Sequence, residues 1–135
     1  MNIALMAHDR KKELMVQFCI AYCGILSGHS ICATNNTGRL VADATGLKIR
    51  NYLSCRQGGD QQIGARIAYN EIDLVLFFSD PARQDLSDVG EIVRLCDRQN
   101  VPIATNAATA EVLVQGLKRG DLDWRNLLKP RKNRK

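Results

Sequence analysis

Short apolar runs and amphipathic stretches alternate along this chain of 135 residues. The apolar runs have the length and composition of β-strands, which we predict over residues 2–6, 30–33, 47–53, 72–78 and 101–105. Residues 72–78 form the most apolar run, which is typical of a central strand buried on both faces. Strands that alternate with helices predict a parallel sheet covered by helices on both sides.

Apolar residues that recur every three or four positions predict the helices between these strands. The first helix is predicted to start at Asp9, as its N-cap, and to continue to Gly28. Thr37 and Asp88 are predicted to cap two later helices, and Gly46 to end the earlier of these. The apolar positions that define the helices are Leu14, Met15, Phe18, Cys19, Tyr22, Ile25, Leu26, Leu40, Val41, Ala44, Ile63, Ile67, Ala68, Val89, Ile92, Val93, Leu95, Cys96, Val112, Leu113 and Leu117, and residues 122–128 add a short helix.

The predicted fold class is therefore α/β: a single-domain, three-layer sandwich with a mostly parallel five-stranded sheet flanked by helices, over residues 1–128. The hydrophobic content of 45% is ordinary for a globular protein. No apolar run approaches the roughly 20 residues that cross a bilayer, so we expect no membrane contact. The first residues reach charge too soon for a signal peptide, which favours a cytoplasmic protein.

The cysteine and charge patterns narrow the function classes further. The five cysteines form an odd count without a C-x-x-C pair, which favours buried thiols over a disulfide framework or a metal site. The net charge is +5, and the predicted C-terminal tail, 129–135, carries five basic residues and no acidic one. The remaining chain is neutral, so nucleic acid is not an expected partner, and only the tail supports that alternative.

Polar residues follow each predicted strand. The carboxyl ends of parallel strands meet at one edge of a sheet, where ligands bind in open α/β folds. The sequence therefore predicts a ligand site at this edge. Its candidate segments are residues 8–9, 34–38, 54–60, 79–81 and 105–106.

Residues 34–38 form a turn rich in hydroxyl and amide groups before a predicted helix. The free N–H groups and partial positive charge of a helix N-terminus suit a phosphate, and Lys12 can add a cation. A plain capping turn is the alternative, and the residues alone leave the two open.

Two glycines, Gly58 and Gly59, precede Asp60 at the start of another helix. Glycine permits a close backbone approach or a positive φ, and Asp60 places a carboxylate there. The residue types alone favour a helix-capping role for Asp60. Clustered with Asp9, Asp80 and Asp88, however, it belongs to a group of carboxylates that can raise one another's pKa values, which suits a general base. His8 is a further candidate, at a strand end.

Several of these segments together resemble the methylglyoxal synthase family over almost the whole chain. The resemblance lies in Met6-Ala7-His8-Asp9, residues 34–38, Gly58-Gly59-Asp60-Gln61-Gln62-Ile63-Gly64-Ala65, Asp80-Pro81 and residues 102–106, in the family's order. It implies the family's fold and a lyase without cofactor or metal. Such an enzyme converts dihydroxyacetone phosphate to methylglyoxal and inorganic phosphate through an enediolate. The resemblance also implies a homohexamer that inorganic phosphate inhibits.

The resemblance implies roles for particular residues. Asp60 is the implied base that removes a proton beside the carbonyl. The resemblance thus overrides the interpretation of Asp60 as a helix cap. His8 is the implied donor to the enediolate oxygen, with Asp9, Asp80 and Asp88 as further catalytic residues. The implied phosphate and substrate ligands are His8, Lys12, Thr34, Asn35, Asn36, Thr37, Ser54, Cys55 and Gly59.

The sequence departs from the family at three places. Asn35 and Asn36 replace a glycine and a threonine, and Cys55-Arg56 replaces Gly-Pro. The loop 82–87 is about two residues shorter and lacks the family's histidine, with Asp85 near its place as a candidate substitute. Since losing an acid–base partner costs on the order of 10²–10⁴-fold in rate, the alternative function is a catalytically impaired or altered regulatory domain that binds a phosphorylated metabolite.

Overall fold

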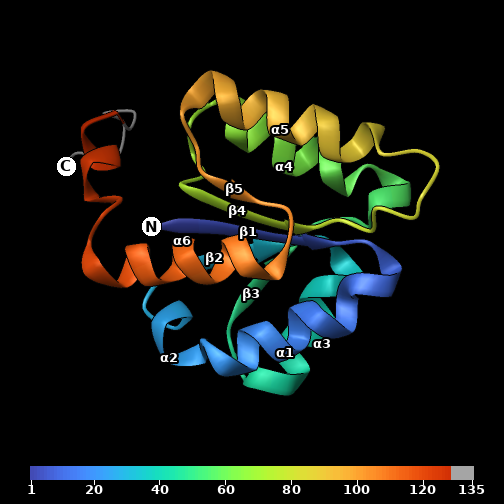
Figure 1. The fold of residues 1–135 in the computed structure, drawn as a ribbon, viewed down its shortest axis with the longest axis horizontal. Coiled ribbons are helices and arrows are strands. Elements are labelled where there is room, and N and C mark those ends of the chain that lie inside the picture. Colours follow the sequence, from blue (N-terminus) through green and yellow to red (C-terminus); the bar gives the residue numbers. More distant parts are fainter. Residues whose placement is uncertain (129–135) are drawn as a thin grey trace.

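The computed structural model describes residues 1–128, which form a five-stranded sheet between two helical layers (Figure 1). The strands are β1 (Asn2–Ala7), β2 (Ser30–Ala33), β3 (Ile49–Asn51), β4 (Leu74–Phe78) and β5 (Ile103–Ala104). Their order is β3-β2-β1-β4-β5, and every neighbouring pair is parallel. The predicted three-layer α/β sandwich is thus confirmed.

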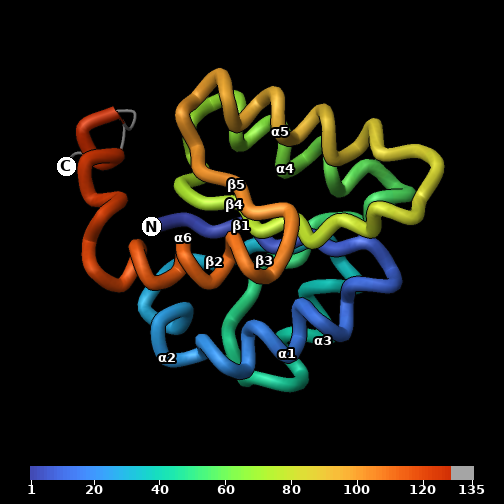
Figure 2. Tube along the Cα trace, viewed as in Figure 1, coloured from blue at the N-terminus to red at the C-terminus, as the bar shows by residue number. Residues whose placement is uncertain are grey.

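The helices divide between the two faces of the sheet (Figure 2). One layer contains α4 (Gly59–Ala68) and α5 (Ser87–Gln99), and the other contains α1 (Lys12–Ala21), α3 (Asn35–Thr45) and α6 (Ala107–Arg119). The shorter helical segments are η1 (Asp9–Lys11), α2 (Cys23–Leu26), η2 (Cys55–Gln57) and η3 (Asp123–Leu128). No helix among the described residues is long and apolar enough to span a membrane.

β4 is buried throughout, as predicted for the most apolar run. Its side chains alternate between the two cores because successive residues of a strand point to opposite faces. Leu76 and Phe78 join the core under α1 and α6, whereas Val75 and Phe77 join the core under α4 and α5.

The central position of β1 decides where the site forms. Strands β2 and β3 lie on one side of β1, and β4 and β5 on the other, so the strand order reverses at this point. Open α/β sheets bind ligands at such a reversal, beyond the carboxyl ends of the strands. Ala7 of β1 pairs with Phe78 of β4, and the His8 N–H donates to the Phe78 carbonyl over 3.1 Å. His8 and the residues after Phe78 therefore leave the sheet side by side.

Some element bounds differ from the sequence predictions. The first helix is not continuous: a turn at Tyr22 separates α1 from α2. The strands β3 and β5 are shorter than predicted. Five residues predicted on apolar helical faces are exposed instead: Leu14, Leu40, Ala44, Ala68 and Val112, of which Val112 is 67% exposed. At these positions the apolar spacing extends onto the solvent side of the helix.

Three predicted helix caps are wrong. The Asp9 carboxylate accepts from Lys12 Nζ and makes no capping hydrogen bond. Thr37 lies inside the first turn of α3, which begins three residues earlier than predicted, with Thr34 at the N-cap position. Asp88 lies inside α5, where its Oδ1 accepts only the next backbone N–H, and Asp85 Oδ1 accepts the Ser87 N–H at 2.9 Å instead. Gly46 ends α3 as predicted, in a left-handed conformation with φ 76°.

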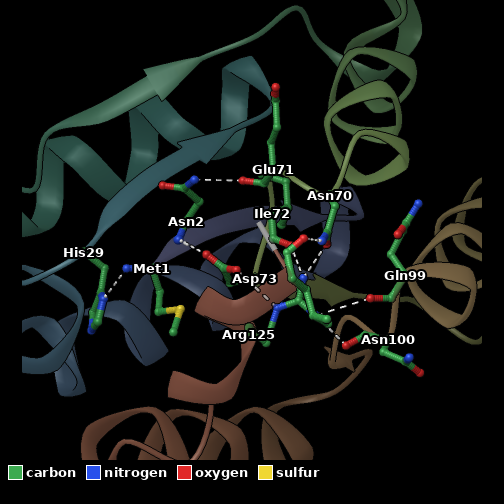
Figure 3. A network of polar contacts seen from close by, with 11 residues as sticks. Met1, Asn2, His29, Asn70, Glu71, Ile72, Asp73, Gln99, Asn100 and Arg125 are labelled. Carbon is green, nitrogen blue, oxygen red and sulfur yellow. Dashed lines mark hydrogen bonds and ion pairs between the residues drawn. The ribbon is translucent and has the colours of Figure 1, made fainter. Parts of the chain in front are cut away.

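A buried arginine fastens η3 to the edge of the sheet where the strands begin (Figure 3). The Arg125 side chain is 0% exposed, and its Nε lies 3.2 Å from Asp73 Oδ1. Its other nitrogens donate to the Asn100 carbonyl and to Asn70 Oδ1, both over 2.6 Å. The Asn2 N–H donates to the same Asp73 carboxylate over 2.8 Å. The network therefore joins both ends of the described chain. The predicted tail, 129–135, lies outside the described residues.

Candidate functional site

A cavity of about 900 Å³ lies at the carboxyl edge of the sheet. The segments that follow β1, β2, β3 and β4 all contribute to its wall, through residues such as His8, Thr34, Ser54 and Asp80. The fifth predicted segment does not contribute: the Asn106 side chain instead accepts the Thr109 N–H at 2.9 Å and caps α6. Two smaller cavities, of about 580 and 590 Å³, contain none of the predicted site residues.

The structure brings most of the predicted site residues together in this cavity. Those that line it are His8, Asp9, Lys12, Thr34, Asn36, Ser54, Cys55, Asp60, Asp80, Asp85 and Asp88. Asn35, Thr37 and Gly59 are not in its lining. Arg10, Arg83 and Ser87 line it and were not singled out in the sequence, because nothing in their local pattern distinguishes them from other exposed polar residues.

His8 is held by hydrogen bonds on both ring nitrogens. Nδ1 accepts the Asp80 backbone N–H at 2.8 Å, and Nε2 lies 3.0 Å from Asp88 Oδ2. Since Nδ1 accepts, the neutral ring carries its proton on Nε2, which donates to Asp88. The ring is 5% exposed and meets Phe77 edge-on, with centroids 5.2 Å apart. The imidazole is therefore fixed in both orientation and tautomer.

Arg83 shares this carboxylate. Its Nη1 lies 3.5 Å from Asp88 Oδ2, the atom that also contacts His8. A cation and an imidazole thus meet at one oxygen on the β4 side of the cavity.

Asp9 and Lys12 form an ion pair at the start of the first helical segments, with Lys12 Nζ 2.7 Å from Asp9 Oδ1. The hydrogen bond and charge of Lys12 lower the pKa of Asp9, and the charges of Arg56 and Arg83 lower it further. The expected upward pKa shift from clustered carboxylates is therefore wrong for Asp9, because the nearby cations outweigh the effect of burial on its pKa. Asp9 is an ionised acceptor at neutral pH.

Asp60 is the second residue of α4, and its half-buried carboxylate lines the cavity. Gly58 sets the entry to the helix with φ 99°, which glycine adopts readily. At Gly59 a β-carbon would collide with the Leu53 carbonyl. The two glycines thus let α4 begin close to the end of β3, and this places Asp60 at the cavity wall.

The turn after β2 presents the N-terminus of α3 to the cavity through Thr34 and Asn36. The Asn35 N–H donates to the Leu53 carbonyl and the Gly38 N–H to the Thr34 carbonyl. The first turn of a helix has N–H groups without intrahelical partners, which suits an anion. Thr37 Oγ1 is buried and has no hydrogen-bond partner among the described residues. An unsatisfied buried hydroxyl is uncommon, and it lies in this same turn.

Cys55 and Asp85 also line the cavity. Burial, reinforced by the charge of Asp60, raises the pKa of the Cys55 thiol. The Ser87 N–H lowers the pKa of Asp85, which is therefore ionised and accepts hydrogen bonds at neutral pH. Within residues 1–128 no group of three His, Cys, Asp or Glu side chains is arranged to hold a metal ion.

Comparison with known proteins identifies the family to which the chain belongs. The model of the MGS-like domain family matches residues 15–105. A methylglyoxal synthase of Caldicellulosiruptor saccharolyticus is 57% identical over 133 residues, 97% of this chain and 94% of that protein. A methylglyoxal synthase of Lysinibacillus sphaericus is 53% identical over 135 residues, 98% of this chain and 100% of that protein.

A solved structure agrees with these relatives. The crystal structure of methylglyoxal synthase from Elizabethkingia anophelis superposes with a TM-score of 0.79 at 40% identity, over 84% of this chain and 76% of that one. The chain therefore belongs to the methylglyoxal synthase family.

Proposed function

We propose that the chain converts dihydroxyacetone phosphate to methylglyoxal and inorganic phosphate. The observation that carries the proposal is the meeting of Asp60, His8 and the α3 N-terminus in one cavity. A base, a fixed donor and an anion site are the three groups that proton abstraction followed by phosphate elimination requires. Relatives more than 50% identical over nearly the whole chain bear the name of this activity.

The chemistry assigns a step to each group. Asp60 removes a proton from the hydroxymethyl carbon beside the carbonyl, and the resulting enediolate carries its charge on oxygen. His8 donates its Nε2 proton toward that oxygen, with Asp88 as its present acceptor. The enediol then releases phosphate: the proton of the hydroxyl on the former hydroxymethyl carbon passes to the leaving phosphate, that oxygen becomes a carbonyl, and the electron pair of the carbon–oxygen bond leaves with phosphate, which gives the enol of methylglyoxal. Ketonisation of this enol adds one proton to the terminal carbon and requires no electron transfer.

The phosphate belongs, in this proposal, at the β2 and β3 side of the cavity. Thr34, Asn36, Ser54 and Cys55 line that side, and Lys12 adds a cation. The predicted ligands Asn35, Thr37 and Gly59 are not in the cavity lining, so they support the residues that line it. Thr37 can turn its unpartnered hydroxyl to the ligand after a small shift of the turn.

Asp80 and Asp9, two further predicted catalytic residues, position other groups of the site. Asp80 presents its backbone N–H to His8 Nδ1, and Asp9 holds Lys12. Asp85 remains a predicted proton carrier of the loop 82–87, and it must release the Ser87 N–H to act.

The test is turnover of dihydroxyacetone phosphate, measured as methylglyoxal and free phosphate in equal amounts. Asp60→Asn should lower kcat by about 10²–10⁴-fold, as expected for loss of a general base. The matched control is Asp43→Asn, an exposed aspartate of α3 outside the cavity, which should keep full turnover.

A second function follows from the histidine-free loop 82–87: binding of a phosphorylated metabolite without turnover. Calorimetric binding of dihydroxyacetone phosphate and inorganic phosphate by a wild type that forms no product would establish it. Product formation that Asp60→Asn abolishes would exclude it.

We also propose a cytoplasmic homohexamer. Large apolar side chains remain exposed on several helices, among them Ile20 (47%), Leu40 (46%) and Val112 (67%). Contact between copies of the chain would bury side chains of this kind, and most homo-oligomers have closed, symmetric arrangements. Light scattering should give six times the mass of one chain, and a monomer in dilute buffer would contradict the proposal.

A further inference from the structure

The loop between β4 and α5 holds the Arg83 backbone beside the cavity. Asp80 Oδ1 accepts the Ala82 N–H at 3.0 Å, and the Asp80 carbonyl accepts the Arg83 N–H at 3.2 Å. Asp80 is itself only 7% exposed and lies two residues after the end of β4. The turn is therefore anchored to a buried residue, and Arg83 leaves it from a defined position.

Arg83 lines the cavity wall on the side of Asp88. Its Nη1 lies 3.5 Å from the Asp88 oxygen that contacts His8. The strand order places this region on the β4 side of β1, whereas Thr34 and Ser54 follow β2 and β3 on the other side. Arg83 thus lies across the cavity from the proposed phosphate site.

His8 and Lys12 already have partners in the structure, whereas most donors of Arg83 do not. The two ring nitrogens of His8 have partners, and Lys12 Nζ is paired with Asp9 at 2.7 Å. Among residues 1–128, the one ion pair of the Arg83 side chain is the 3.5 Å contact with Asp88, and its charge also acts on Asp9 and Asp85. A guanidinium group has five N–H donors, so most of those on Arg83 remain available to a ligand.

We infer that Arg83 binds the oxygens of the bound ligand that lie away from its phosphate, as a cationic donor beside His8. The inference rests on the proposed function, which identifies these oxygens as the carbonyl and hydroxyl oxygens of the substrate and the enediolate. When Arg83 turns to the ligand, it gives up only its 3.5 Å ion pair with Asp88. The side chain is 45% exposed, so it has room to make this movement.

Arginine suits the binding of these oxygens but cannot transfer a proton to them. Its planar fork can bind two adjacent oxygens, and its charge opposes the negative charge that develops on the enediolate. It stays protonated at all relevant pH values, so it cannot carry a proton. Proton transfer therefore stays with Asp60 and the other titrating groups of the cavity.

The test compares two ligands that share a phosphate group. Inorganic phosphate probes the phosphate site alone, whereas the hydroxamate of phosphoglycolate adds a planar group that imitates the enediolate. Calorimetry on Arg83→Met should show the hydroxamate bound about 10- to 100-fold more weakly, the loss that one charged hydrogen bond gives. Inorganic phosphate should bind within about twofold of the wild type.

Two further variants complete the experiment. Arg83→Lys keeps the charge without the fork, and its affinity for the hydroxamate should fall between those of the wild type and Arg83→Met. Arg94→Met removes an exposed arginine of α5 that pairs only with Glu91 among the described residues, and both ligands should bind as they do to the wild type.

The outcomes separate this inference from the proposed function. Equal weakening of both ligands in Arg83→Met, or no weakening, would overturn the role of Arg83 even if the wild type makes methylglyoxal. Selective weakening of the hydroxamate would support the role even if the wild type shows no turnover, and only the lyase proposal would then fail. A wild type that does not bind the hydroxamate would overturn the inference as well.

Discussion

His8 and Asp88 lie 80 positions apart in the chain, yet His8 Nε2 is 3.0 Å from Asp88 Oδ2. The contact joins the end of β1 to the first turn of α5. Together with the Asp80 N–H on Nδ1, it leaves the imidazole one orientation and one tautomer. Because β1 and β4 are parallel neighbours, His8 and Asp80 leave the sheet together, and the contact with Asp88 then holds the His8 ring as a positioned donor.

We expect Asp88→Ala to lower kcat for dihydroxyacetone phosphate about 100-fold, the cost of an approximately 1 Å misplacement of a reacting group. Asp88→Asn keeps an oxygen that can accept from Nε2, so its kcat should fall less. Steady-state kinetics at equal thermal stability measure both variants. Equal kcat in Asp88→Ala and the wild type would show that His8 does not depend on Asp88.

Gly59 permits the close approach between α4 and the end of β3. Gly59→Ala places a β-carbon against the Leu53 carbonyl, a backbone atom that cannot rotate away. Overpacking of this kind costs about 1–3 kcal/mol, so the free energy of unfolding and the turnover should both fall. Urea denaturation measures the first.

The control for this substitution is Gly90→Ala in α5, where an added β-carbon meets nothing within 4 Å. Alanine there should stabilise the protein by up to about 1 kcal/mol, because glycine is the poorer helix former. If Gly59→Ala were as stable as Gly90→Ala, the close approach would not require glycine.

The periodicity of the sequence was sufficient to predict the layers and the sheet. The run 72–78 identified β4 because both faces of that strand are buried, and the strand ends predicted most of the cavity wall. Short edge elements were less predictable: β5 contains only Ile103–Ala104, although five residues were predicted. Edge strands pair on one side only, so few residues have the contacts that define a strand.

The capping predictions failed for a different physical reason. Asp9 and Asp88 have the residue type and position of caps, but a lysine and a histidine compete for their oxygens. Only folding brings His8 to Asp88, so no local pattern records that contact, whereas the i,i+3 pair of Lys12 with Asp9 is local and competes with capping from within the first turns. The same limit hid Arg83, whose partner Asp88 lies on the next element.

The buried Arg125 should contribute strongly to stability. Arg125→Ala removes the cation beside the buried Asp73 carboxylate and three carbonyl contacts, with Gln99, Asn100 and Ile72. Breaking a buried ion pair on one side costs about 3–5 kcal/mol, which thermal denaturation should show. The network lies at the edge where the strands begin, so turnover at low temperature should persist.

Arg119→Ala is the matched control for Arg125→Ala. Its guanidinium pairs with Asp121 at 2.9 Å, but both side chains are more than half exposed. Exposed pairs contribute about 0–1 kcal/mol, so this variant should unfold close to the wild type. Equal effects of the two substitutions would show that burial of Arg125 adds nothing.

The Cys55 thiol reports on the cavity through its ionisation. Burial, with the charge of Asp60 adding to it, raises the pKa of this thiol. The thiolate is the reactive form, so a raised pKa means less of it at neutral pH and slower alkylation. Iodoacetamide should therefore modify Cys55 several-fold more slowly than a cysteine peptide at neutral pH, and the difference should shrink as the pH rises past the raised pKa.

Because Cys55 lines the proposed phosphate side, inorganic phosphate should slow the reaction further, whereas the rate at Cys23, outside the cavity, should not change. Mass-spectrometric mapping of the alkylated peptides resolves the two sites, and phosphate protection of both or of neither would contradict this placement.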